Sequence, residues 1–380
     1  MALTALSPAE VAATVAGQTL TVGVEEEFLL LDPVSWHNAP LCEAARDALP
    51  PAAREHSRVE FRRSMMEMVS PVCTSLSQLR RHLLENRSAA ADAAAAVGAR
   101  LVAVAATPLD EPDTSVVDTP RFHAISRHYG PIAHDPALCG CHVHVGVPDR
   151  ELAIQVCNAI RPWLPVVQAL TANSPLHAGA DTGHASWRGI ALQRWPSLGP
   201  PPYLESAEDY ARTVEELVAT GVMLDASMVL WWARPSSRYP TVEVRVGDVS
   251  PTAAETVLVA GLVRALVATA VADIAADRPA PRVSDHLLRA AHWNAAHAGL
   301  DGTLTDPRRR TTRPAWSLVD ELVATVGDAL DRHGDRDVVT AGLARLRRHG
   351  NGATRQRRAF GEGASVPAVL AELAAATTSG

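Results

Sequence analysis

The chain has 380 residues, 47% of them hydrophobic, and a net charge of −7, which is the composition of a folded globular protein with a substantial core. All 35 basic residues are arginines, which excludes a P-loop with its lysine, a Schiff-base lysine and the strand lysine of protein kinases. The acidic balance argues against a general nucleic-acid partner, and five cysteines without a spaced framework favour a reducing cytoplasm.

Residues 1–19 are expected to form a short helix or a loose arm without a secretory signal. A strand is predicted over 20–30, with three consecutive acids in its middle. Glu25 and Glu27 share one face of this strand and Glu26 lies on the other. Adjacent carboxylates repel one another. A solvated edge strand would explain the triplet, and so would a cation held between Glu25 and Glu27.

The next predicted strand, 59–71, carries Glu60 and Glu67 in otherwise apolar surroundings. Pairing of Glu67 with Arg62 or Arg63 and a metal-ligand role are equally compatible with this pattern. A helix from about residue 75 to Gly98, a buried strand over 100–106 and a proline-rich loop over 107–120 are expected to follow.

A strand over 139–147 places His142 and His144 on one face, at positions i and i+2, so both can reach one pocket. A lone strand histidine is more often structural, but two on one face between glycines favour function. A helix over 149–172, bent at its prolines, is predicted next. Residues 173–204 are predicted to form a long loop, whose tryptophans and arginines favour order and binding.

A helix over 206–220 and an apolar strand over 224–233 precede the strand 240–248. In that last strand three valines alternate with Glu243, Arg245 and Gly247. Charged side chains on one face are costly unless that face meets solvent, a metal or a charged ligand.

The rest of the chain is expected to be helical. A capping box at Thr252 opens a long apolar helix to about residue 277, which is interpreted as buried rather than membrane-spanning because it contains charged residues. Further helices are predicted over 283–298, 314–332, 337–348 and 365–377. With no clear linker or repeat, residues 1–380 are expected to form a single α+β domain, in which 280–380 is the helical C-terminal part.

Taken by face, these strands offer one set of convergent side chains: Glu25, Glu27, Glu67, His142, His144, Glu243 and Arg245. Glu60 is a further candidate for this set. An oxygen-rich set with few histidines suits Mg²⁺, or Mn²⁺ in its place. Two or three such ions could hold the phosphates of ATP, and Arg245 could stabilise charge on a transferring phosphoryl group.

The ordered motifs resemble those of the type-2 glutamate–cysteine ligase family, the carboxylate–amine ligases of the glutamine-synthetase-like superfamily. The residues that carry the resemblance are GVEEEF (23–28), MEMVSPVC (66–73), GCHVHVG (140–146), SWR (186–188), RWP (194–196), TVEVRV (241–246) with Asp248, GLDG (299–302) and GNGA (350–353). They span about residues 20 to 360, and the ordered set is more specific than any one motif.

This resemblance implies a curved antiparallel sheet that forms an open funnel backed by helices. It implies ATP-dependent ligation through an acyl phosphate, typically of the γ-carboxyl of L-glutamate to cysteine. Carried over residue by residue, the metal ligands would be Glu25, Glu27, Glu67, His142 and Glu243, with Glu60 a further match. Arg245, beside Glu243 in the catalytic centre, would contact the phosphates, and His144 the nucleotide. Arg188 and Arg194, with Trp187, could hold substrate carboxylates.

Several alternatives remain open at this point. Asn294 and His297 stand beside Trp293 where the family pattern is more basic, so the enzyme could join a different acid and amine in specialised metabolism. A zinc hydrolase built on His142, His144 and Glu243 is the first rival. A non-catalytic relative that binds an amino acid or nucleotide is the second. No membrane partner is expected, and homo-oligomerisation is left open.

Overall fold

The computed structural model describes residues 7–379, and its centre is a seven-stranded sheet. The strands run in the order β10-β11-β5-β1-β3-β2, and β4 also pairs with β1. They are β1 (Val22–Leu31), β2 (Ser57–Arg58), β3 (Met65–Val69), β4 (Arg100–Val102), β5 (Gly140–Gly146), β10 (Ala233–Pro235) and β11 (Thr241–Asp248). Every pairing in this sheet is antiparallel, which confirms the predicted α+β fold class.

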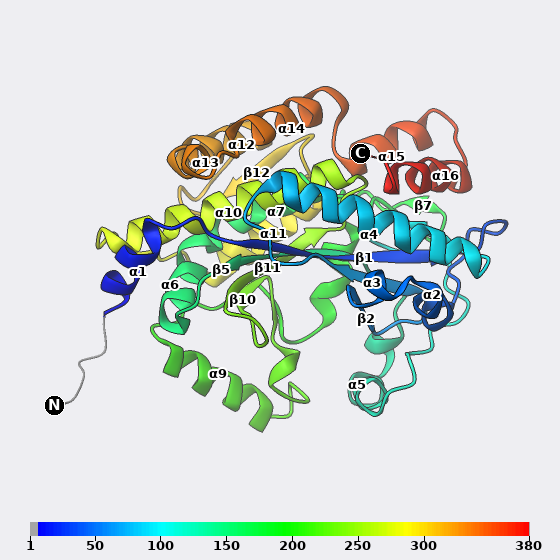
Figure 1. The fold of residues 1–380 in the computed structure, drawn as a ribbon, viewed down its shortest axis with the longest axis horizontal. Helices are drawn as coiled ribbons and strands as arrows, with labels where there is room; N and C mark the ends of the chain where they lie inside the picture. Colours follow the sequence, from blue (N-terminus) through cyan, green and yellow to red (C-terminus); the bar gives the residue numbers. More distant parts are fainter. Residues whose placement is uncertain (1–6, 380) are drawn as a thin grey trace.

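Helices cover one face of the sheet (Figure 1). They are α4 (Leu76–Ala96), α6 (Arg150–Ile160), α7 (Leu164–Thr171) and α10 (Ala253–Ala275). The alternating apolar side chains of the strands, such as Val24, Val143 and Val244, pack against these helices in the largest core cluster. The opposite face of the sheet, which carries the charged residues, lies above α5 (Pro120–Tyr129) and α9 (Ala207–Ala219) in Figure 1.

Helix α10 is long and apolar enough to cross a membrane by composition, but 78% of its most apolar stretch is buried inside the protein. It contacts the sheet, α1 (Pro8–Ala16), α4, α6 and two C-terminal helices. Its charged Arg264 is fully buried and paired with Asp335 at 2.6 Å. The expectation of a buried helix is therefore confirmed.

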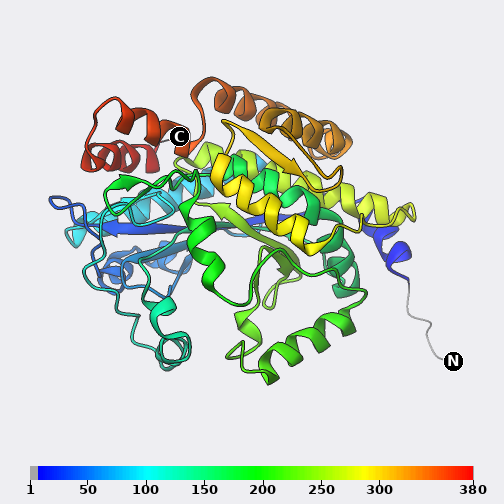
Figure 2. The ribbon, with the colours of Figure 1, turned by 180° about the vertical axis from the view of Figure 1, so that it is seen from behind.

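The C-terminal part is mostly helical, as expected, and lies along the top of Figure 2, where several of its helices pack on α7 and α10. Its helices are α11 (Asp285–Ala298), α12 (Ala315–Thr325), α13 (Gly327–His333), α14 (Arg336–His349), α15 (Gly352–Gly361) and α16 (Val366–Thr377). The hairpin of β12 (Thr303–Asp306) and β13 (Thr311–Pro314) was not predicted, and the arginine run 308–310 lies at its turn.

Several predicted boundaries were wrong. The strand predicted over 59–71 is shorter in the structure, because residues 59–64 between β2 and β3 are irregular. In this segment the Arg62 side chain turns inward and donates to three backbone carbonyls. Residues 224–233 form a 3₁₀ turn and short strands rather than one strand. Sequence reasoning also missed helices α2 (Cys42–Ala48), α3 (Pro51–Arg54), α5 and α15. The single helix predicted over 314–332 is two helices, α12 and α13.

The predicted loop 173–204 contains short ordered elements. They are β6 (Leu176–His177), β7 (Ala180–Asp181), α8 (Trp187–Ala191), a 3₁₀ turn (Leu192–Arg194) and β8 (Leu198–Gly199), which pairs with β9 (Leu230–Trp231). The predicted break in the helix 149–172 is confirmed, because a 3₁₀ turn at Arg161–Trp163 separates α6 from α7.

Candidate active site

Strand register brings the predicted acids and histidines onto one face of the sheet. Glu25 of β1 stands opposite His142 of β5, and Glu27 stands opposite Glu67 of β3. His144 in turn stands opposite Glu243 of β11. Because cross-strand partners share a face, three neighbouring strand pairs assemble one cluster from distant parts of the sequence.

A β-bulge interrupts β11 just beyond this cluster, between Val244 and Gly247. Arg245 lies in the bulge and keeps its side chain beside Glu243, as predicted. The prediction that Gly247 shares their face was wrong. The bulge pairs Gly247 with Cys141, on the side of the sheet that packs against Thr171 of α7.

The two histidines contact Glu25 from β5. His142 Nδ1 lies 3.0 Å from Glu25 Oε2, and His144 Nε2 lies 3.3 Å from Glu25 Oε1. Burial opposes ionisation of Glu25, but hydrogen bonds and charge from both histidines outweigh it and hold its pKa below the usual range. His144 Nε2 is buried without an aligned hydrogen-bond partner among the described residues. Donor atoms of Glu25, His144 and Glu243 all lie within 4.8 Å of one another.

Glu243 is held between two arginines. Arg234 of β10 approaches from the neighbouring strand, with its Nε 3.0 Å from Glu243 Oε2, and Arg245 binds the other oxygen. Burial again opposes ionisation, but the charges of Arg245 and Arg234 lower the pKa of Glu243 overall. This carboxylate is therefore ionised and compensated without any added cation.

A second group of acids has no such compensation. Burial, followed by the charge of Glu27, raises the pKa of Glu60 to about 7. Burial and the charges of Glu60, Glu25 and Glu27 raise the pKa of Glu67 well above its usual range. Carboxylates that share a buried site in this way are stabilised when a cation binds between them. The oxygen-rich donor set fits a divalent cation such as Mg²⁺, and His144 Nε2, which lies beside Glu25 Oε1 without a well-aligned hydrogen bond, can add a nitrogen ligand.

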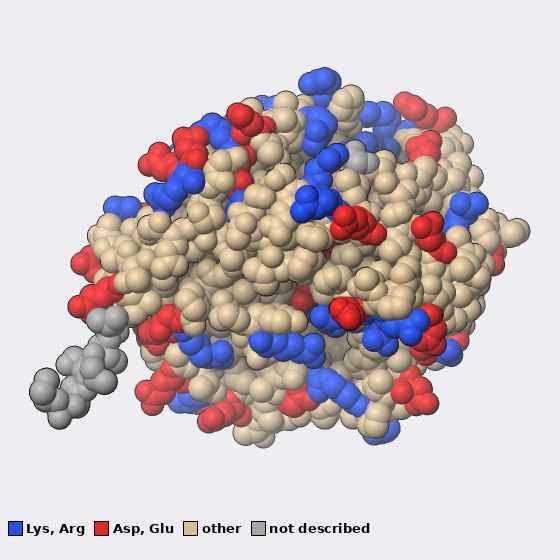
Figure 3. Space-filling view, in the orientation of Figure 1, with Lys and Arg blue, Asp and Glu red and all other residues tan. Residues whose placement is uncertain are grey.

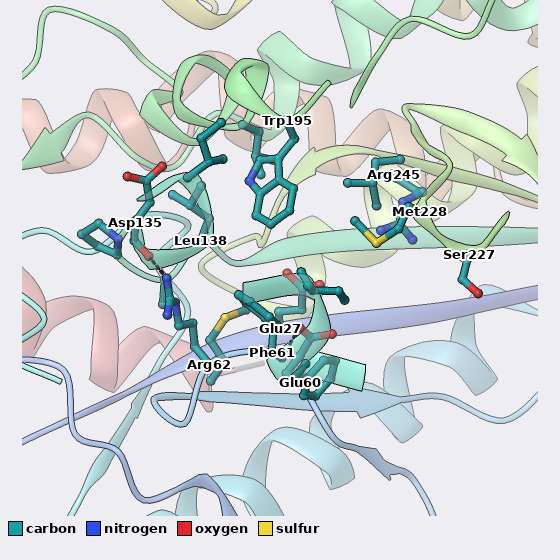
Figure 4. Close-up of a pocket in the computed structure, with 18 of the residues that line it drawn as sticks. Glu27, Glu60, Phe61, Arg62, Asp135, Leu138, Trp195, Ser227, Met228 and Arg245 are labelled. Carbon is teal, nitrogen blue, oxygen red and sulfur yellow. Dashed lines mark hydrogen bonds between the residues drawn. The ribbon is translucent and has the colours of Figure 1, made fainter. Parts of the chain in front are cut away.

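Two adjoining cavities open from the cluster, each of about 320 Å³. The polar chamber carries the acids, both histidines and many arginines, and its cationic residues are Arg58, Arg121, Arg234, Arg238 and Arg245. The apolar chamber lies beside it (Figure 4), and its wall includes Phe61, Phe122, Ile125, Leu138, Trp195 and Met228. Glu60, Arg121 and Arg245 line both chambers, so the two spaces meet at the charged cluster.

The predicted substrate-binding residues lie near the cluster but line neither chamber. Arg188 is buried, 3.4 Å from the carbonyls of Arg245 and Val246 and 3.8 Å from Asp248. Trp187 and Arg194 line a separate cavity of about 490 Å³. Their substrate roles stay predictions, and the position of Arg188 favours support of the β11 bulge instead.

Several lining residues were not singled out from the sequence. Arg234 pairs in register with Glu243 across the β10–β11 hairpin, a relation that an alternating charge pattern on two adjacent strands could have suggested. Arg121 and Phe122 come from α5, whose start is marked in the sequence by Thr119 followed by proline. No local signal distinguishes Arg58, which reaches the cluster opposite Glu67.

The outer surface shows no comparable concentration of one charge on the face in Figure 3, where arginines and acids are interspersed. All five cysteines, including Cys139 and Cys141, are free and buried.

Comparisons with known proteins agree with this geometry. The family model described as glutamate–cysteine ligase family 2 matches residues 21–372. A Salinispora arenicola protein that carries the provisional name glutamate–cysteine ligase 2 is 62% identical over 360 residues, covering 94% of this chain and 95% of its own. A Nocardia farcinica protein, provisionally named glutamate–cysteine ligase 2-1, is 48% identical over 363 residues, covering 95% and 94% of the two chains.

Solved structures show the same fold at low sequence identity. Glutamate–cysteine ligase from Francisella tularensis, solved in complex with AMP, superposes with a TM-score of 0.67 at 11% identity, over 95% of this chain and 89% of that one. A bifunctional glutathione synthetase from Pasteurella multocida superposes with a TM-score of 0.66 at 13% identity, over 97% of this chain and 53% of that one. From the family match and the close relatives, the chain belongs to glutamate–cysteine ligase family 2.

Proposed function

We propose that the protein forms an amide through an acyl-phosphate intermediate, joining the γ-carboxyl of L-glutamate to the amino group of cysteine or of another amine. Membership of a ligase family makes the chain an ATP-dependent carboxylate–amine ligase. The proposal concerns the intermediate, the substrates and the residues that act. One observation carries it: acids and histidines from four adjacent strands converge where an arginine-rich chamber meets an apolar one.

The polar chamber suits the polyphosphate of ATP. With no lysine in the chain, phosphate oxygens need arginine, backbone N–H groups or cations as partners. Arg58, Arg121 and Arg238 line this chamber together with Arg234 and Arg245. Mg²⁺ held by Glu25, Glu27, Glu60, Glu67, His142, His144 and Glu243 would neutralise phosphate charge that otherwise repels an anionic carboxylate.

The proposed chemistry has two steps. In the first, a carboxylate oxygen of the acid attacks the γ-phosphorus, the bond from that phosphorus to the bridging oxygen of ADP breaks, and ADP leaves. In the second, the neutral amine attacks the acyl carbon, the carbon–oxygen bond to phosphate breaks, and the nitrogen loses a proton. Arg245 lies at the junction of the chambers, where it can stabilise negative charge in both steps. The enclosing residues would keep water from the acyl phosphate.

The decisive experiment follows ADP release and isotope transfer. The purified protein receives ATP, Mg²⁺, L-glutamate labelled with ¹⁸O in its carboxylates, and a mixture of amines. An acyl phosphate moves one labelled oxygen from the acid to inorganic phosphate, and the product mass identifies the amine. Glu67→Gln is the matched inactive variant.

The other outcomes separate the alternatives. Release of ADP with a different acid would keep the chemistry and change the substrate. Amide formation without label in phosphate would exclude the acyl phosphate. No ATP consumption with any mixture, together with one tightly held zinc ion, would favour the hydrolase. No ATP consumption without zinc would favour a binding protein.

A further inference from the structure

The apolar chamber is walled by aromatic and branched side chains that come from five separate segments of the chain. Phe61 and Phe122 meet edge-to-face at 5.4 Å between ring centroids, and Phe61 meets Trp195 in the same way at 6.4 Å. Trp195 also packs on Tyr129 at 5.0 Å. Figure 4 shows Phe61 and Trp195 among the residues that line this cavity, together with Leu138 and Met228. Aromatic rings held at these separations form a fixed apolar surface.

The charged residues around this chamber already have partners, except where it opens onto the cluster. Arg62 is 3% exposed and donates to the carbonyls of Thr114, Ala133 and Asp135. The Asp135 carboxylate pairs with Arg194. The Arg121 guanidinium likewise pairs with Asp225.

The opening is acidic on one side. Glu27 and Glu60 line it together with Arg245, and both acids belong to the cluster proposed to activate the acid substrate. This opening is where the two chambers meet, beside the site proposed for the acyl phosphate, so a nucleophile whose body fills the apolar chamber can reach the acyl carbon there. The chamber therefore suits the nitrogen-bearing substrate, with its amino group at the opening and its body against the aromatic wall.

We propose that this chamber selects an amine with an aromatic or bulky apolar body in preference to cysteine, an inference that rests on the proposed function. The cavity measures about 320 Å³. Pockets of roughly 300–1,000 Å³ enclose ligands well above the size of a CH₂SH group. A cysteine side chain would leave most of this apolar wall without contact, so the wall residues would lose the dispersion attraction that a larger substrate provides.

The test compares amines with the acid and nucleotide fixed. With Mg²⁺, ATP and the acid that supports ADP release, kcat/KM is measured for 2-phenylethylamine, L-phenylalanine, ethanolamine and L-cysteine. One of the two aromatic amines is expected to exceed cysteine by tens of fold, since each methylene in an apolar pocket is worth roughly 10-fold or more. Comparison of L-phenylalanine with 2-phenylethylamine, which lacks the carboxylate, also shows whether the amine substrate is an amino acid.

Two variants connect the preference to the chamber. Trp195→Ala is expected to raise the KM for the aromatic amine at least tenfold and to leave the KM for ATP and for the acid within twofold. Leu192→Trp, at a half-buried lining position, should narrow the space and reduce aromatic amine use while ethanolamine use is retained. Trp293→Ala is the matched control, because Trp293 is 48% exposed on α11 and lines neither chamber.

A binding measurement separates this inference from the proposed function. Calorimetric titration of 2-phenylethylamine into the protein loaded with Mg²⁺ and ADP should detect binding that Leu192→Trp abolishes and Trp293→Ala retains, whether or not a reaction occurs. Absent binding would overturn the inference, as would a cysteine kcat/KM equal to or above those of the aromatic amines. Absence of ADP release with every acid would instead overturn the proposed function and leave the binding result standing.

Discussion

The Glu26 carboxylate accepts hydrogen bonds from Arg87 on both oxygens, at 2.6 and 3.0 Å, although these residues lie 61 positions apart. Both side chains are buried between β1 and α4. The middle acid of the triplet is therefore a structural ion pair, while Glu25 and Glu27 on the other face belong to the cluster. One strand thus carries a structural acid on one face and two acids of the cluster on the other.

Glu26→Gln should lower the free energy of unfolding by about 3–5 kcal/mol, because it leaves the Arg87 charge buried without its partner. Denaturant unfolding in chelator measures this loss. Glu27→Gln is the matched control, since it removes one of several clustered carboxylates, and its stability should stay within about 1 kcal/mol of the parent. Equal losses in the two variants would contradict the division of roles.

Two further acids should differ in the same assay. Glu67 is ionised only with difficulty, so Glu67→Gln should preserve or raise the stability of the metal-free protein at neutral pH. Glu243 compensates the charges of Arg234 and Arg245, so Glu243→Gln should lower the free energy of unfolding of the metal-free protein by about 2–4 kcal/mol. Both variants should lose ADP release. A higher stability for Glu243→Gln than for Glu67→Gln would show that the pKa directions are assigned the wrong way round.

Removal of metal should destabilise the protein in a concentration-dependent way. A ligand that binds only the folded state adds about 2.7 kcal/mol at a hundredfold excess over its Kd. Adding Mg²⁺ to chelator-treated protein should therefore raise the unfolding free energy in the parent chain and much less in Glu67→Gln. Sodium chloride at matched ionic strength controls for screening. An identical response to both salts would argue against a divalent site.

Much of the cluster could be predicted because side chains alternate strictly along a strand. That rule placed Glu25, Glu27, His142, His144 and Glu243 correctly by face, and antiparallel pairing then brought them together. It failed at Gly247, where the bulge shifts the register by a backbone irregularity that the residue pattern does not show.

Contacts across long sequence separations could not be predicted. Nothing in the sequence distinguishes Arg87 from the other helical arginines before α4 packs on β1. Arg234 comes directly after the predicted apolar strand 224–233, in a position for which no role was predicted. The apolar chamber is assembled from segments between residues 27 and 245, most of them irregular, so no periodicity marks it. Arg188 was given a substrate role from its loop, but its burial beneath the β11 bulge depends on the tertiary fold.

The GNGA motif supports a tight contact rather than chemistry. A Cβ on Gly352 would lie 2.0 Å from Asn173 Oδ1, and the Asn173 side chain is fixed by hydrogen bonds to Ala103, Val249 and Gln356. Gly352→Ala should lower stability by about 1–3 kcal/mol through overpacking. Thermal unfolding compares it with Gly361→Ala, where the added methyl meets open space. Similar melting temperatures for the two variants would refute the contact.

A buried histidine outside the active site should give the protein a specific pH dependence. His292 of α11 is fully buried, with its Nδ1 2.7 Å from Gln168 Oε1 and its ring packed on Trp232. Burial lowers the pKa of His292 well below 6.5, so the folded state keeps it neutral while the unfolded chain takes up a proton. Stability that is fully present above about pH 6.5 is therefore lost as the pH falls, with a limiting slope of about 1.4 kcal/mol per pH unit.

His292→Gln should remove this contribution to the slope of unfolding free energy against pH between about 6.5 and 5.5. The difference in slope from the parent chain is the relevant quantity, because other titrating groups contribute equally to both proteins. His286→Gln, at an exposed position near the start of the same helix, is the matched control and should leave the slope unchanged. Equal slopes in the parent and His292→Gln would mean that the folded protein binds a proton at this histidine, and its neutral burial would have to be abandoned.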